Sequence, residues 1–272
     1  MAWRRLFEHR LGMIGLVVIL GNILLAILAP WIASDPLKVD VANREAFPSR
    51  EFFFGTDEYG RDIFSRVIYG TRISLYISLL SVAVASIFGV AIGAVAGYYG
   101  GLTDNILMRF MDAIMSFPAI LLAIGIMAVL GGHLFNVVIA LGFVYIPRFA
   151  RIIRGSVLSL KEKGFVEASL AMGNSDLIII WRHILPNCTA PLIVQATVSL
   201  AYAILAEASL SFLGLGAPPP APSWGNILSD ARNFMLDAPW MTVFPGIAIT
   251  LAVLGFNLFG DALRDVLDPR LK

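Results

Sequence analysis

Long apolar stretches recur along the chain, and short polar segments separate them. Six of these stretches hold no charged residue or a single one, and a helix of about 20 such residues crosses the roughly 30 Å of hydrocarbon in a bilayer. The fourth stretch is the shortest and is expected to continue past Arg148 into the headgroups. The pattern therefore predicts an all-α, multi-pass membrane protein with six transmembrane helices. The stretches are 11–33, 73–99, 113–130, 134–147, 188–212 and 240–260.

The amino-acid composition agrees with this pattern. Hydrophobic residues make up 58% of the 272 residues and charged residues 14%, against about 25% charged in soluble domains. These values exclude a soluble globule and a disordered chain. The net charge of +1 offers no basic surface for nucleic acid. One cysteine and three scattered histidines match no structural zinc site.

The distribution of lysine and arginine predicts the orientation in the membrane. Segments 1–10, 148–187 and 264–272 hold three, six and three of them, whereas segments 34–71 and 214–239 hold five and one. Because cytosolic loops carry the excess of positive charge, both terminal tails are expected in the cytosol. The first apolar stretch also resembles a signal peptide in its flanks, but its length favours an uncleaved anchor.

The cytosolic segment 148–187 is the longest loop, and its sequence favours ordered helices. A short helix is expected over 165–173, with Gly173 in the C′ position, and a second one over 174–187, with Pro186 stopping it. The residues alone allow two interpretations, a protrusion that docks on a partner or an amphipathic pair that packs under the bundle. A basic stripe suited to anionic headgroups precedes these helices: Arg148, Arg151 and Arg154.

The amino-acid sequence of this loop resembles a known motif. Glu167-Ala168-Ser169 is followed after three residues by Gly173, and the segment ends with Leu185-Pro186. This is similar to the EAA loop of ABC importer permeases, E-A-A-x3-G-x9-I-x-L-P, with two departures, Ser169 for Ala and His183 for Ile. The resemblance implies that the loop forms a coupling helix that docks into a groove on an ATPase subunit.

Further segments resemble the C-type permease subunit of dipeptide, oligopeptide and nickel ABC importers. This resemblance implies a type I ABC permease core with five transmembrane helices over 72–263. The core would follow a first transmembrane helix at 11–33 and an outer segment at 34–71. The segments that carry the resemblance are 54–70, 207–216, 222–226 and 261–270.

The chain lacks the G-x-x-x-x-G-K-[ST] loop that cradles nucleotide phosphates, and it contains neither a G-x-S-x-G nor an H-E-x-x-H motif. It is therefore not expected to be an enzyme or to bind a cofactor. The resemblance implies that ATP and Mg²⁺ bind to two partner ATPase subunits. It also implies a B-type permease as heterodimer partner, an external solute-binding protein and a place in the prokaryotic inner membrane, where a peptide-like solute or a nickel complex moves inward.

Three charged residues within the apolar stretches are candidates for the transport pathway or its gate. Glu207 is the sole charge of the fifth stretch. A substrate cation and a structural hydrogen bond to a neighbouring helix explain it about equally well. Arg109 and Asp112 lie one helical turn apart, so an ion pair between them is favoured over a gate. Pro118 just beyond them is expected to kink the helix.

Two patterns outside the loop also carry expectations. Segment 57–70 alternates apolar and charged sides, so an amphipathic helix along the outer membrane interface is expected there, with contact to the binding protein as a further role. Small residues recur every fourth position in the second stretch and are expected to pack within this chain rather than on the partner permease. They are Ser81, Ala85, Gly89, Gly93 and Gly97.

Two other classes of protein are alternatives to an ABC permease. A self-contained, ion-coupled secondary transporter needs coupling carboxylates near the midplane and usually an internal repeat. Glu207 alone supports it weakly, and no repeat is visible. A membrane scaffold without transport activity leaves the motif in the cytosolic loop unexplained.

Overall fold

The computed structural model describes residues 9–267. Within this range the regular secondary structure is helical, and the only β feature is one isolated bridge between Thr56 and Asp62. Five helical stretches are long and apolar enough to cross a membrane, or six when one bent pair of helices is counted as a single span. The predicted all-α, multi-pass architecture is confirmed. The long helices are α2 (Arg10–Ile32), α3 (Ile63–Tyr99), α6 (Leu134–Leu160), α9 (Thr189–Phe212) and α11 (Trp240–Leu267).

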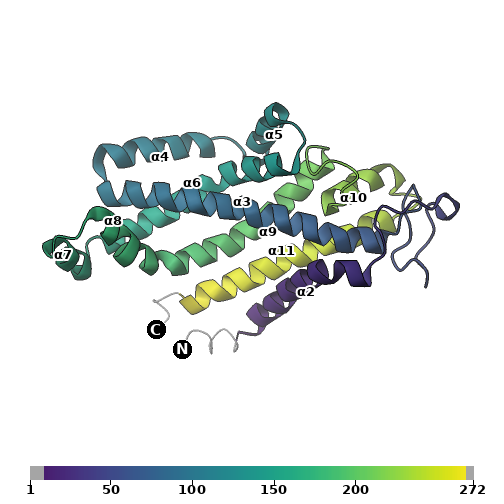
Figure 1. Cartoon of the computed structure of the whole chain (residues 1–272), viewed down its shortest axis with the longest axis horizontal. Helices are drawn as coiled ribbons and strands as arrows, with labels where there is room; N and C mark the ends of the chain where they lie inside the picture. Colours follow the sequence, from purple (N-terminus) through teal and green to yellow (C-terminus); the bar gives the residue numbers. More distant parts are fainter. Residues whose placement is uncertain (1–8, 268–272) are drawn as a thin grey trace.

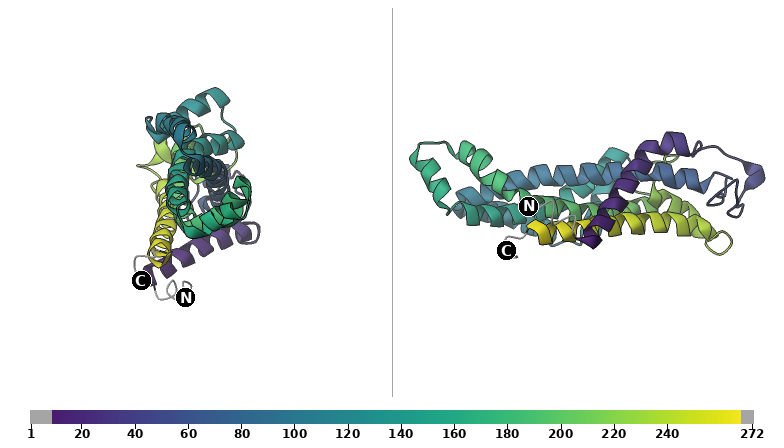
Figure 2. Two further views of the ribbon diagram at one scale, coloured as in Figure 1. Left: turned by 90° about the vertical axis from the view of Figure 1, so that its left-hand side faces the viewer. Right: turned by 90° about the horizontal axis from the view of Figure 1, so that it is seen from below.

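The long helices run side by side in an elongated bundle (Figures 1 and 2). The short helices α7 (Gly164–Ala171) and α8 (Asp176–Ile178) project from one end. Segment 33–62 and helix α10 (Trp224–Ala231) cover the opposite end. The bundle thus carries a distinct structure at each of its two ends.

The third predicted span is not one continuous helix. It consists of α4 (Gly101–Met115) and α5 (Ala119–Leu130), which meet at an angle of 89°. Pro118 stands at the break with an extended ψ of 126°. Because proline has no N–H and disfavours the helical conformation in the residue before it, the expected kink becomes a full break.

Helices α3 and α6 form the tightest pairing of the bundle. A Cβ on Gly97 would lie 2.8 Å from the Cβ of Val157, and side chains on Gly89 and Gly93 would collide with the backbone of α6 near Ala150. Small residues at this spacing let two helix backbones approach closely. The prediction that this stripe packs within the chain is confirmed.

The expected interfacial helix over 57–70 is wrong. Helix α3 begins at Ile63, where the Asp62 carboxylate accepts a hydrogen bond of 3.0 Å from the Ser65 N–H, and it continues without interruption to Tyr99. Both Ile63 and Arg66 are buried against neighbouring elements rather than lying on a membrane surface. The amphipathic pattern reflects packing of the first turns of a long spanning helix.

The loop predicted at 148–187 starts later than expected. Helix α6 continues to Leu160, so only residues 161–188 lie between two spanning helices. Two members of the basic stripe, Arg151 and Arg154, face helix α4 instead of headgroups. Arg154 pairs with Asp104 through two contacts of 2.5 Å, and Arg151 pairs with Asp112 at 2.5 Å. These ion pairs give partners inside the chain to two charges in the last part of α6.

Candidate functional site

Residues 161–188, here called the projecting segment, protrude from one end of the bundle (Figure 1). Helix α7 ends at Ala171, and Gly173 follows with φ of +78°. Its N–H donates to the Leu170 carbonyl at 2.9 Å. This left-handed conformation reverses the chain direction and favours glycine, so the expected C′ role of Gly173 is confirmed.

The turn is held by Ser169, one of the two residues that depart from the EAA motif. Ser169 is fully buried, and its hydroxyl accepts a hydrogen bond of 3.0 Å from the Asn174 side-chain amide. An alanine at position 169 could not make this contact. The serine therefore adds a side-chain hydrogen bond that connects the two sides of the turn.

One face of the projecting segment packs on the bundle, and the other is open. Val166 is buried in a cluster with Ile179, Ile180 and Ile184, whereas Glu167 and Ala168 are exposed. Exposed apolar groups of this size mark a surface for a protein partner or a membrane. The large exposed apolar residues of the segment are Phe165, Leu170, Met172, Leu177, Ile178 and Trp181.

The end of the projecting segment corrects one expectation. Pro186 does not stop the helix before the fifth span. The chain passes from α8 into a π-helical stretch, Ile179–Ile184, then a 3₁₀ stretch, Leu185–Cys188, and directly into α9. Leu185 is half-buried and Pro186 is exposed. Changes of winding accommodate the missing N–H of proline without ending the helix, so the segment is continuous with a spanning helix.

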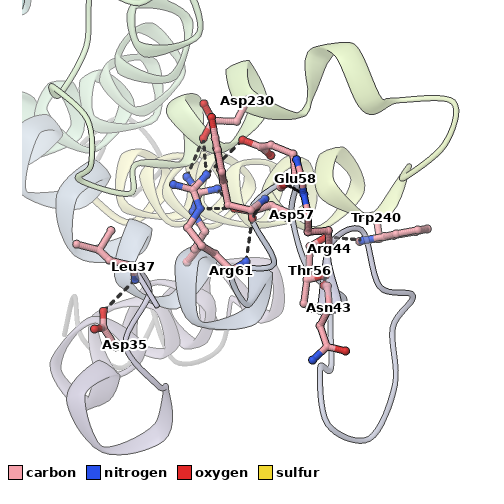
Figure 3. A network of polar contacts seen from close by, with 12 residues as sticks. Asp35, Leu37, Asn43, Arg44, Thr56, Asp57, Glu58, Arg61, Asp230 and Trp240 are labelled. Carbon is pink, nitrogen blue, oxygen red and sulfur yellow. Dashed lines mark hydrogen bonds and ion pairs between the residues drawn. The ribbon is translucent and has the colours of Figure 1, made fainter. Parts of the chain in front are cut away.

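A network of charged side chains ties segment 33–62 to the opposite end of the bundle (Figure 3). Arg66 is 2% exposed and contacts the carboxylates of Asp57 at 2.5 Å and Asp230 at 2.8 Å. Arg61 adds a contact of 2.6 Å to Asp57. Burial raises the pKa of the nearby Glu58 carboxyl. Because the buried charges are paired, this end of the molecule is an ordered cap.

The three predicted pathway residues do not meet in one place. Glu207 is fully buried, and one of its oxygens accepts a hydrogen bond of 2.7 Å from the Ser211 hydroxyl. Asp112 pairs with Arg151 from α6, so the expected Arg109–Asp112 pair is wrong. Arg109 is exposed on α4. For Asp112 on α4, Arg151 of the neighbouring helix α6 is a closer partner than Arg109, which lies one turn away on α4.

Arg148 lies deep in the bundle, whereas the sequence pattern predicted that it would lie at the headgroups. Arg148 is 14 residues from the start of α6 and 12 from its end. Its guanidinium lies over the rings of Tyr145 and Tyr202. Because the uncharged apolar stretch ends at Pro147 in the sequence, only the continuation of α6 to Leu160 shows that Arg148 is near the middle of a spanning helix.

The fold is similar to that of a solved transporter subunit. A chain of the inward-facing MetNI methionine ABC transporter superposes with a TM-score of 0.60 at 20% sequence identity, over 76% of this chain and 98% of that chain. A second crystal form of the same transporter gives a TM-score of 0.60 at 19% identity. The chain thus shares its fold with a chain of an ABC transporter.

Comparison of the sequence with protein families assigns the chain more closely. Residues 89–272 match the family described as binding-protein-dependent transport system inner membrane component. Residues 1–48 match the N-terminal TM domain of oligopeptide transport permease C. The chain belongs to the family of binding-protein-dependent transport system inner membrane components. This is a family of transport permeases, not of enzymes.

Three curated relatives are similar over nearly the whole chain. A putative peptide transport system permease protein of Brucella abortus is 55% identical over 99% of this chain and 91% of its own length. The dipeptide transport system permease protein DppC of Alkalihalophilus pseudofirmus is 48% identical over 100% and 90%. The glutathione transport system permease protein GsiD of Escherichia coli is 45% identical over 99% and 90%.

Proposed function

We propose that this chain is a permease subunit of an ATP-driven importer that carries peptide-like solutes, such as dipeptides or oligopeptides. The relatives that support this solute class are named for peptide, dipeptide and glutathione transport. Within residues 9–267, no cluster of three histidine, cysteine or carboxylate side chains could hold a bare nickel ion. A nickel complex stays the second solute to test.

The projecting segment is the observation that carries the coupling role. Its exposed face holds Glu167 and Ala168 together with large apolar side chains, while Ser169 and Gly173 shape the turn beneath them. A rigid, apolar protrusion that continues into a spanning helix through Leu185-Pro186 would transmit a push from a partner into the bundle. We assign this face to an ATPase subunit, which binds the ATP and Mg²⁺.

The complete importer would contain this chain, a B-type permease, two ATPase subunits and an external solute-binding protein. The projecting segment and both chain termini would face the cytosol of a prokaryotic cell, and the cap that contains Arg66 would face outward across the inner membrane. The distribution of lysine and arginine supports this orientation. The solute would pass between the two permeases.

Two experiments test this function. Mild extraction from the native membrane and mass spectrometry should recover the chain with a second permease and two ATPase copies. The reconstituted complex should take up peptides only when ATP and the solute-binding protein are present. Recovery of the chain alone, active in proton-driven peptide uptake, would overturn the proposal in favour of a secondary transporter. The burial of Glu207 within the helix bundle weighs against that alternative.

A further inference from the structure

A cavity of about 260 Å³ opens between helices α5, α6 and α9. Its polar lining comes from Tyr145 and Arg148 on α6 and from Tyr202 and Ser209 on α9, and its other walls are apolar. Pockets that enclose a whole small-molecule ligand measure about 300–1,000 Å³. The cavity is therefore large enough for one end of a solute, and the remainder would extend toward the partner permease.

Arg148 brings a permanent positive charge to this cavity. At about 1.5 Å per residue, it lies roughly 20 Å from either end of α6, close to the middle of a spanning helix. Within residues 9–267, its guanidinium forms no ion pair with a carboxylate, whereas Arg151 and Arg154 on the following turns are both paired. A charge at this depth is costly, and it faces an aqueous cavity or a binding partner.

Two aromatic rings hold the guanidinium in place. Its Cζ lies 5.2 Å from the ring centroid of Tyr145 and 5.0 Å from that of Tyr202, within the range of cation–π attraction. The Tyr145 hydroxyl donates a hydrogen bond of 3.2 Å to the Tyr202 carbonyl, which joins α6 to α9. The rings stabilise the cation without neutralising it. Its N–H groups stay available to an acceptor in the cavity.

We propose that Arg148 binds a carboxylate of the transported solute, which in a peptide is the C-terminal carboxylate. This inference rests on the proposed function. A guanidinium presents paired N–H donors that match the two oxygens of a carboxylate, and it keeps its charge at any physiological pH. The same charge repels a free metal cation. Arg148 would thus select peptide-like acids over cations in the pathway.

The test uses the complete importer in proteoliposomes, with Arg148→Gln and Arg148→Lys variants of this chain. Each is supplied with the same dipeptide as a free acid and as a C-terminal amide, at concentrations that saturate the binding protein. We expect Arg148→Gln to lower uptake of the free acid per ATP hydrolysed by about tenfold. A change of this size corresponds to the loss of one charge-assisted hydrogen bond. Uptake of the amide should change little, and Arg148→Lys should be intermediate.

Arg151→Gln is the matched control. It removes the same kind of charge one turn further along α6, from a pair with Asp112 in which both side chains are about half exposed. Exposed pairs contribute little, so uptake should match the unmodified importer. Yield of the assembled complex and its ATP hydrolysis without solute show whether each variant is folded.

The outcomes separate this inference from the proposed function. If the unmodified importer takes up no peptide, the proposed function fails. If it takes up peptide and Arg148→Gln leaves solute uptake per ATP unchanged, only the role of Arg148 is overturned. Equal losses for the free acid and the amide, or loss of the assembled complex, would also overturn it, because they would show that Arg148 supports the structure of the complex rather than recognising the carboxylate.

Discussion

At the scale of single residues, Arg66 joins parts of the chain that are far apart in sequence. It contacts Asp57 nine residues before it and Asp230, 164 residues after it. We expect Arg66→Gln to lower the free energy of unfolding by about 2 kcal/mol, because the buried Asp57 carboxylate would lose one of its two charged partners and keep only Arg61. Thermal unfolding of the purified chain in detergent measures this loss.

Arg232→Gln is the control for this measurement. Arg232 lies at the same end of the molecule but is exposed, so its replacement should change the unfolding temperature very little. A similar small effect for Arg66→Gln would mean that the network contributes no more than a surface ion pair. Limited proteolysis of segment 33–62 would show whether the cap itself loosens.

Glu58 gives a prediction about pH. Burial raises the pKa of this carboxyl, so the folded chain holds the proton at pH values where the unfolded chain has released it. The corresponding stability is present at low pH and is lost as pH rises through the raised pKa. We therefore expect Glu58→Gln to be the more stable form at pH 8, with the difference shrinking toward pH 5. A variant less stable at pH 8 would show that the contact with Arg61 outweighs burial.

At the scale of elements, the contact between α3 and α6 depends on missing side chains. We expect Gly89→Leu to destabilise the chain by about 3 kcal/mol or more, because the new side chain would collide with Phe149 and with the Ile146 carbonyl on α6. Gly155→Leu is the matched control, since a Cβ on Gly155 meets nothing within 4 Å. The measurement is the unfolding temperature of each of the two variants under the same conditions. Equal stability of the two variants would contradict tight packing between α3 and α6.

At the scale of the whole molecule, the projecting segment links a partner to the spanning helices. Gly173 has φ of +78°, and a Cβ there would meet no atom within 4 Å, so a substitution acts through backbone strain alone. We expect Gly173→Val to lower ATP-driven uptake roughly fivefold or more, which corresponds to strain of about 1 kcal/mol in the turn. Membrane insertion should be unchanged, because the spanning helices are untouched.

Gly173→Asn separates strain from the loss of glycine itself. Asparagine enters the left-handed region more readily than valine, so this variant should retain most of the uptake. The measurement is peptide uptake by the reconstituted importer, with ATP hydrolysis recorded in parallel. If valine is tolerated as well as asparagine, the shape of this turn does not carry the coupling.

Much of the architecture could be predicted from the sequence. The apolar stretches locate the spanning helices, because a chain inside hydrocarbon must satisfy its backbone hydrogen bonds within the segment. The turn at Gly173 and the break near Pro118 follow from the backbone preferences of glycine and proline. These features are local, and local sequence is sufficient to determine them.

The tertiary structure decided which charges meet. Asp112 pairs with Arg151 across 39 residues and Asp104 with Arg154 across 50, and neither pair follows from spacing along one helix. The depth of Arg148 depends on how far α6 continues, which those same pairs support. Helix periodicity reports which residues share a face, but the partner of a charge is set by the neighbouring helix that packs against that face.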